Sequence, residues 1–261
     1  MSRQRPVASI VCFIMLMLLI PNQIGLPATS TESRQGTPQV VPELRAPEVQ
    51  ETTFTPSDDS DPTIRFLGRN ANFRDIAWRP GQSFALIVGL NGEVISYDGN
   101  HFALLMESSP YPIYAVDWHH SGNFALLVGG TGAVVEYNSS GLHSLSPVSS
   151  SNLLEVAFNP FTDDALLVGE NGAIIHYDSG TFTSLQSPTP STIRAVEWDN
   201  AGAKAIMIGD AGQALIYSRV TQDLTWLGRS ETFYDVSWNS DSSYGLIVGY
   251  GDLCLGYDGS R

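Results

Sequence analysis

Residues 73–98 read FRDIAWRPGQSFALIVGLNGEVISYD, and the framework of this stretch recurs along the chain. An aromatic residue stands at position 78 and at every fortieth residue after it, a glycine follows eleven positions later, and a tyrosine eight positions after that. The three series are Trp78, Trp118, Phe158, Trp198 and Trp238; Gly89, Gly129, Gly169, Gly209 and Gly249; and Tyr97, Tyr137, Tyr177, Tyr217 and Tyr257. Five repeats without an insertion or deletion indicate one repeated structural unit.

Each repeat predicts four short β-strands. In the first repeat, residues 73–78 alternate in polarity, which is typical of a strand with two different faces. Residues 85–89 are continuously apolar, which indicates a strand covered on both faces. Residues 94–97 and 101–105 follow as a third and a fourth strand, separated by a Tyr-Asp-Gly turn. Four strands in 40 residues, repeated five times, predict an all-β fold, a five-bladed β-propeller.

The sequence also predicts how the ring closes. Residues 63–70 (TIRFLGRN) match residues 223–230 (DLTWLGRS) at an offset of four repeats. The repetitive part of the chain, 63–261, therefore begins with the fourth strand of a repeat and ends with a third strand. We expect strand 63–70 to pair with the last blade, because this pairing closes the ring and covers two exposed sheet edges.

The repeat resembles the WD-repeat propellers. The resemblance rests on Trp-Arg-Pro-Gly at 78–81, the apolar strand and glycine turn after it, and Tyr-Asp at 97–98. The turn at 88–92 (Val-Gly-Leu-Asn-Gly) is equally similar to extracytoplasmic propellers of the photosystem-assembly-factor type. The third strands end in Tyr-Asp, Tyr-Asn or Tyr-Ser rather than Trp-Asp, and the family's Gly-His is absent. The resemblance implies a propeller fold and no particular partner.

The first 62 residues differ in composition from the repeats. Residues 1–28 have two arginines, an uncharged apolar run at 7–20 and a proline that ends it, as in an export signal. An uncleaved N-terminal membrane anchor formed by residues 7–20 is the alternative. Residues 29–62 are rich in Pro, Thr, Ser and Glu, which predicts a disordered linker. We therefore expect a secreted or extracytoplasmic protein, with the N-terminal segment as its membrane tether in the anchored form.

Charge and cysteine content exclude several classes of protein. Acidic residues outnumber basic residues 27 to 13, which gives a formal net charge of −14. Nucleic-acid binding needs a basic surface, and the chain has one lysine, Lys204. Its two cysteines do not make a disulfide scaffold. Cys254 occupies the position of Val94 and Ile174 in earlier repeats, so we expect it to be a buried apolar side chain.

The variable positions of the repeats predict a binding face at one end of the blades. These positions lie near the start of each first strand and directly after each repeated glycine. Arg and Tyr are enriched at the energetic centres of protein interfaces. The candidate binding residues are Arg74, Tyr114, Arg194, Tyr234, Glu170, Asp210 and Tyr250. The alternative is that these side chains only cover strand edges.

One acidic residue per repeat lies on the predicted axial side of the first strand. Asp75, Glu155 and Asp235 stand three residues before the repeated aromatic residue, and Asp117 and Glu197 stand one residue before it. Residues two apart on a strand share a face, so the five carboxylates would line the axis. Such a ring would bind a hard cation such as Ca²⁺ through oxygen. The alternative is that each carboxylate caps backbone N–H groups of the next blade.

Short, uniform connections argue against a walled active site, so we expect no enzyme activity and no cofactor besides the axial cation. Adjacent residues on a strand or turn point apart, so His119-His120 indicates a solvated turn rather than a metal site.

The leading hypothesis is a monomeric, exported module that binds another protein or a glycan. A five-bladed glycoside hydrolase, with two carboxylates in one pocket, and a purely structural module are the alternatives.

Overall fold

The computed structural model describes residues 52–53, 72–109, 111–226 and 230–258. The predicted closing strand 63–70 and the predicted signal 1–28 lie outside the described residues. Of the predicted linker 29–62, only Thr52 and Thr53 are described, and they form a short strand, β1, that pairs with β5. In the described part of the chain, no helix is both long and apolar enough to cross a bilayer.

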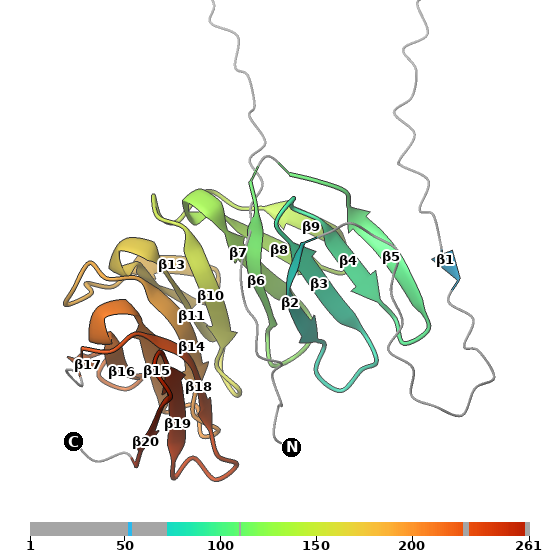
Figure 1. The fold of residues 1–261 in the computed structure, drawn as a ribbon. Coiled ribbons are helices and arrows are strands. Elements are labelled where there is room, and N and C mark those ends of the chain that lie inside the picture. The colour runs from blue at the N-terminus through green and yellow to red at the C-terminus, as the bar shows by residue number, and fades with distance from the viewer. Residues whose placement is uncertain (1–51, 54–71, 110, 227–229, 259–261) are drawn as a thin grey trace, which may run out of the picture.

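The described chain forms five antiparallel sheets that follow one another in sequence order, from cyan to red in Figure 1. The first has β1 (Thr52–Thr53), β2 (Phe73–Trp78), β3 (Ala85–Gly89), β4 (Val94–Tyr97) and β5 (His101–Met106). The second has β6 (Ile113–Trp118), β7 (Ala125–Gly129), β8 (Val134–Asn138) and β9 (Gly141–Ser144). The third has β10 (Leu153–Phe158), β11 (Asp164–Gly169), β12 (Ile174–Asp178) and β13 (Thr181–Ser184).

The last two sheets repeat the same order of strands. The fourth sheet has β14 (Ile193–Trp198), β15 (Lys204–Gly209), β16 (Ala214–Ser218) and β17 (Leu224–Trp226). Among the described residues the fifth sheet has three strands, β18 (Phe233–Trp238), β19 (Gly245–Gly249) and β20 (Leu253–Tyr257). The predicted all-β fold is therefore confirmed, as five antiparallel sheets of three to five described strands in a propeller-like arrangement.

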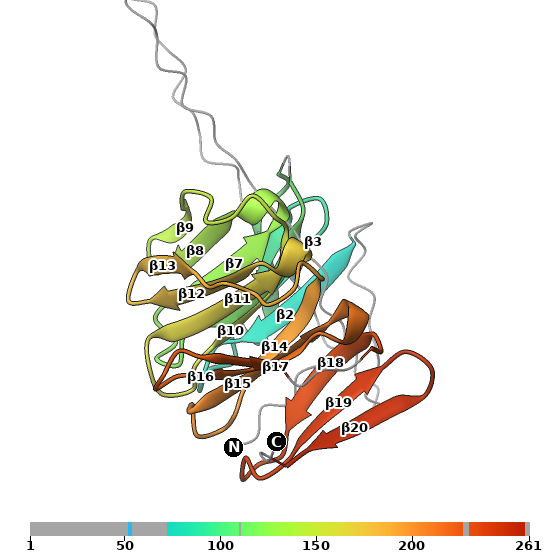
Figure 2. The ribbon, with the colours of Figure 1, turned by 90° about the vertical axis from the view of Figure 1, so that its left-hand side faces the viewer.

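Apolar side chains between consecutive sheets form the core, in four clusters. Each cluster joins the aliphatic face of one sheet to the face of the next sheet that carries the repeated aromatic residue. Leu86 of the first sheet and Trp118 of the second share one cluster, and Leu166 and Trp198 share another. The first strands of consecutive sheets are neighbours, and the sheets lie face to face in Figures 1 and 2. The predicted burial of the second strands is confirmed for β3, β7 and β11.

The repeated glycine is required by a close approach of two chain segments. A Cβ atom on Gly169 would lie 1.9 Å from the carbonyl oxygen of Asn152, and one on Gly209 would lie 2.0 Å from that of Thr192. Both carbonyls accept a hydrogen bond from the residue after the glycine, at 2.9 Å from Glu170 N and from Asp210 N. The glycine therefore lets the end of the second strand touch the chain that enters the first strand.

Candidate functional site

A β-bulge near the start of each first strand shapes one end of the sheets. Between β14 and β15, Ile193 pairs with Gly209 and Ala195 pairs with Ile208, so Arg194 is an extra residue in the ladder. The other four sheets have the same register shift. The extra residues are Arg74, Tyr114, Leu154, Arg194 and Tyr234. Bulges re-aim side chains and occur next to functional sites. We call this end of the sheets, with the turns after the repeated glycines, the loop-end face.

Arg194 and Asp210 form the central ion pair of the loop-end face. Arg194 Nε donates to Asp210 Oδ1 at 2.7 Å, and its Nη2 donates to Asp210 Oδ2 at 2.9 Å, in the two-bonded geometry that fixes both side chains. The hydrogen bonds with Asp210 raise the pKa of Arg194 against the opposing effect of burial, and the carboxylates of Asp210 and Glu170 act in the same direction as the hydrogen bonds. Carboxylates of the third and fourth sheets therefore both act on Arg194.

Two turns of this face are fixed by hydrogen bonds to one asparagine. Asn152 Nδ2 donates to Glu170 Oε2 at 3.0 Å, and Asn152 Oδ1 accepts from Thr131 N at 2.8 Å. Thr131 and Glu170 belong to the short 3-10 turns η1 (Gly130–Gly132) and η2 (Glu170–Gly172). The Glu170 carboxylate is therefore held by the segment that enters its own sheet, and Asn152 also links it to the turn of the second sheet.

The aromatic and basic candidates of this face differ in exposure. Tyr250 is 74% exposed and Tyr234 is 50% exposed, so both rings are open to a ligand. Tyr114 and Arg74 are half-buried. Arg74 Nε is shielded from solvent and has no hydrogen-bond partner among the described residues. The open part of the face is therefore the part built by the fourth and fifth sheets.

A polar groove of about 570 Å³ lies beside Glu170. Its walls are the loop 148–151, the turn and strand 171–175, and the loop 184–190. Hydroxyl and amide side chains dominate these walls, and none of the lining residues is charged. Asn171 Nδ2 donates to Ser151 Oγ at 3.1 Å, which ties two of the walls together, and Ser187 Oγ donates to the Thr189 carbonyl at 2.8 Å within the third wall. The sequence analysis did not find this groove, because three separate segments build it.

Four of the five acidic residues of the first strands, Asp75, Asp117, Glu155 and Asp235, accept hydrogen bonds from backbone N–H groups. Asp75 Oδ2 accepts from Val116 N of the next sheet at 2.8 Å, and Asp117 Oδ2 accepts from Phe158 N of the sheet after it, also at 2.8 Å. This is the capping arrangement that the sequence analysis gave as the alternative. The remaining acids of the series are Glu155, which is buried, and Glu197 and Asp235, which are half-buried. A cation held by this series stays a prediction.

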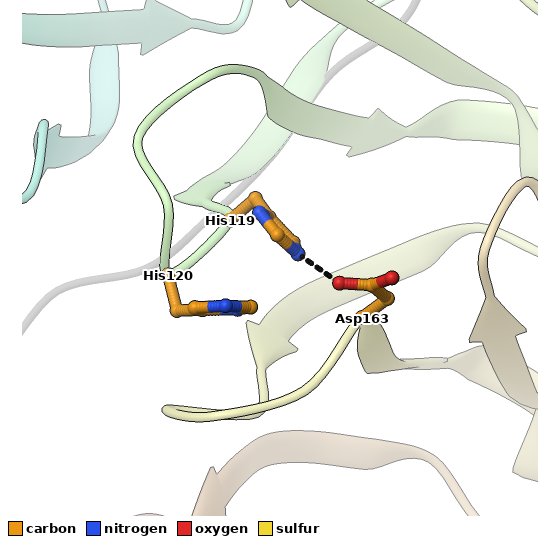
Figure 3. Close-up of side chains that lie close together, drawn as sticks. All are labelled: His119, His120 and Asp163. Atoms are coloured by element: carbon orange, nitrogen blue, oxygen red, sulfur yellow. Dashed lines mark hydrogen bonds and ion pairs between the residues drawn. The ribbon is translucent and has the colours of Figure 1, made fainter.

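One cluster of metal-ligating side chains occurs within the described ranges, and it is His119, His120 and Asp163. Figure 3 shows the two histidine rings on the same side of their turn, with His119 facing Asp163. The two ring centroids are 4.1 Å apart, and His119 is buried. The prediction of a solvated turn with diverging histidines was therefore wrong for His119, because the chain turns between the two residues and brings their rings together.

The comparisons with known proteins add no family to these observations. No protein-family model matches the chain, and no curated protein matches it. The functional argument therefore rests on the repeat, the sheets and the side chains of the loop-end face.

Proposed function

We propose that this chain is a non-catalytic binding module that recognises another protein through the loop-end face. The observation that carries the proposal is the Arg194–Asp210 ion pair on the fourth sheet together with the exposed Tyr234 and Tyr250 of the fifth sheet. Tyr234 and Tyr250 offer large, stiff contact surfaces with few rotatable bonds. Arg194 is positioned by its carboxylate partner and keeps about two-fifths of its side chain exposed, so it is oriented before a partner binds.

The groove supports a second candidate, a glycan ligand. Sugars are recognised by hydroxyl and amide groups that both donate and accept hydrogen bonds, and the lining of the groove supplies both. Asn171, Gln186 and Ser187 are the side chains that offer such groups at its walls. We place the protein partner first, because no large aromatic ring lines the groove while two exposed rings stand on the loop-end face.

We further propose that the five sheets are the blades of one closed, five-bladed propeller of WD-repeat type, with strand 63–70 in the last blade. The support is the exposure of the two end sheets. Leu246 is 50% exposed and Trp78 is 53% exposed, whereas their equivalents at the sheet–sheet contacts, such as Leu166 and Trp198, are buried. Cys254 is exposed for the same reason, contrary to the prediction that it is buried. Ring closure would join these two complementary apolar faces.

The module is also proposed to act outside the cytoplasm. This part rests on the sequence, where residues 1–28 have the character of an export signal or of a membrane anchor. A disordered stretch at 29–62 would then separate the binding module from the membrane or from the cleavage site. The loop-end face would be free to meet another extracytoplasmic protein.

Site-specific photo-crosslinking in the native cell tests the binding face. A photoreactive amino acid at position 250 should give a discrete protein adduct, and one at position 161 should not. Phe161 is a matched control, because it is 64% exposed and lies in the turn after β10, at the other end of its sheet. The additional substitution Arg194→Ala should weaken the adduct about 30-fold, the effect of losing a 2 kcal/mol hot spot.

Two results would refute the proposal for a protein partner. One is equal crosslinking from positions 250 and 161, and the other is an adduct that Arg194→Ala leaves unchanged. Binding of the purified chain to immobilised glycans, lost in Asn171→Ala but retained in Arg194→Ala, would instead assign the groove as a glycan site.

A further inference from the structure

The turns at the far end of the sheets, opposite the loop-end face, are joined to each other by a repeated hydrogen bond. Arg79 Nε donates to the Gly122 carbonyl of the next sheet at 2.5 Å, and Asn159 Nδ2 donates to the Gly202 carbonyl of the next sheet at 2.8 Å. Arg79, His119 and Asn159 occupy the same position of successive repeats. His119 makes its inter-sheet contact differently, because it bonds a side chain, that of Asp163 in the turn after β10.

The His119 ring is held rigidly. It stacks on Phe124, with ring centroids 4.6 Å apart, and packs edge-on against Phe158 at 5.3 Å. Ser121 Oγ lies 2.7 Å from His119 Nδ1, and Ser121 N donates to the same nitrogen at 3.3 Å. Because Nδ1 accepts that N–H, the proton of the neutral ring is on Nε2, which donates to Asp163 Oδ1 at 3.0 Å. The His119 ring is therefore fixed in place, and its Nε2 is aimed at a carboxylate of the next sheet.

His120 supplies a second imidazole at the same place. It stands where Pro80 and Pro160 stand in neighbouring repeats, so it replaces a turn residue with a ligating one. Its ring is tilted by 49° against His119. His120 Nδ1 is shielded from solvent and has no hydrogen-bond partner in the described part of the chain. A shielded nitrogen without a partner is costly unless something satisfies it.

We propose that His119, His120 and Asp163 bind a divalent transition-metal ion, Zn²⁺, which links the turn of the second sheet to the turn of the third. One ligand atom of each residue lies within 4.8 Å of the other two. Two ligands at 2.0–2.1 Å from a tetrahedral ion are about 3.3 Å apart, close to the 3.0 Å between His119 Nε2 and Asp163 Oδ1. The ion would take the place of the proton on Nε2, and the neutral ring would then carry its proton on Nδ1, where Ser121 Oγ, 2.7 Å away, can accept it.

The ligand types select the metal. Two imidazole nitrogens and one carboxylate suit Zn²⁺ and its neighbours in the transition series, whereas Ca²⁺ and Mg²⁺ prefer oxygen ligands. The contact of Ser121 with Nδ1 acts on the far side of the His119 ring, as the outer partners of zinc-bound histidines do. Asp163, with a side chain 58% exposed, has room to adjust. Three protein ligands leave the fourth position to water or to a donor from outside.

Metal titration of the full chain tests the site. Zn²⁺ should compete with a chromogenic chelator and bind one ion per chain, and Co²⁺ in its place should give the strong visible absorption of a tetrahedral site. His120→Ala and Asp163→Asn should each weaken binding at least a hundredfold, since even outer partners of a metal site contribute 10- to 100-fold. His143→Ala is the matched control and should leave the affinity unchanged, because His143 lies on β9 and contacts Ser140.

The variants avoid His119, whose burial makes its replacement a test of folding as well as of binding. Circular dichroism of His120→Ala and Asp163→Asn establishes that both fold. The proposal is overturned if the wild-type chain binds no Zn²⁺ at micromolar concentrations. It is also overturned if His120→Ala and Asp163→Asn bind as tightly as the wild type, or if His143→Ala weakens binding as much as they do.

Discussion

Replacement of Trp198 by phenylalanine tests the inter-sheet hydrogen bond that recurs in this fold. Trp198 Nε1 donates to the Ala157 carbonyl of the preceding sheet at 3.0 Å, and the residue is only 5% exposed. Its ring packs edge-on against Tyr217 at 5.7 Å. Trp238 makes the equivalent contact with the Glu197 carbonyl, but at 3.4 Å and half-buried. Phe158 occupies the same position in the third sheet, so the backbone accepts a phenylalanine there.

The magnitude follows from what each substitution removes. In Trp198→Phe the Ala157 carbonyl loses a buried donor, which costs about 1–3 kcal/mol. The smaller ring adds the loss of buried apolar area and a small cavity, for a total of about 2–4 kcal/mol. In Trp238→Phe the bond is long and solvent reaches the site, so we expect about 1 kcal/mol or less.

Urea and thermal unfolding of the two variants and the wild type measure these costs. Trp198→Phe should lower the melting temperature by roughly 5–15 °C, and Trp238→Phe by no more than about 4 °C. The two proteins differ only in which repeat carries the same substitution, so effects of composition cancel. Equal destabilisation by the two substitutions would refute the reasoning, as would a cost below about 0.5 kcal/mol for Trp198→Phe.

Two further predictions follow from the described contacts. Burial alone would raise the pKa of Asp164, but hydrogen bonds from Thr162, Arg219 and His176 outweigh it and lower the pKa. The folded pKa then lies below the unfolded value, so this stabilisation is present above about pH 4 and is lost as the pH falls through the folded pKa. Asp164→Asn should cost about 2 kcal/mol in urea unfolding at pH 7 and almost nothing at pH 2, and a pH-independent cost would contradict this. If the ring is closed, a double-mutant cycle of Trp78→Ala and Leu246→Ala should show a coupling of at least about 0.5 kcal/mol, and strict additivity would argue for an open ring.

The sequence predicted the strands of the repeats closely. Expected strands at 73–78, 85–89 and 94–97 are β2, β3 and β4, and the expected 101–105 is one residue shorter than β5. These predictions succeed because alternation, apolar runs and turn residues are local properties of the chain. Because the repeat is exact, the strand positions assigned in the first repeat also predict the first, second and third strands of the other four sheets.

The sequence predicted which residues belong to the loop-end face, but it did not predict which of them pair with each other. Arg194 and Asp210 both came from the variable positions of the repeat, while their ion pair depends on the register shift that makes Arg194 the extra residue of its strand. Nothing in the alternation of residues 193–198 marks that bulge. The polar groove was missed for a related reason, because its walls belong to loops separated by strands.

Local sequence determined what each repeat is, and tertiary structure decided which repeats touch and which side chains meet. The burial expected for Cys254 holds for its equivalents Val94 and Ile174, which have a neighbouring sheet on that face, whereas Cys254 on the last sheet is exposed. His119 and Asp163 are 44 residues apart in sequence and belong to different sheets, yet their atoms are 3.0 Å apart. The physical reason is that strand formation depends on neighbours along the chain, whereas burial and ligand geometry depend on the packing of one sheet on the next.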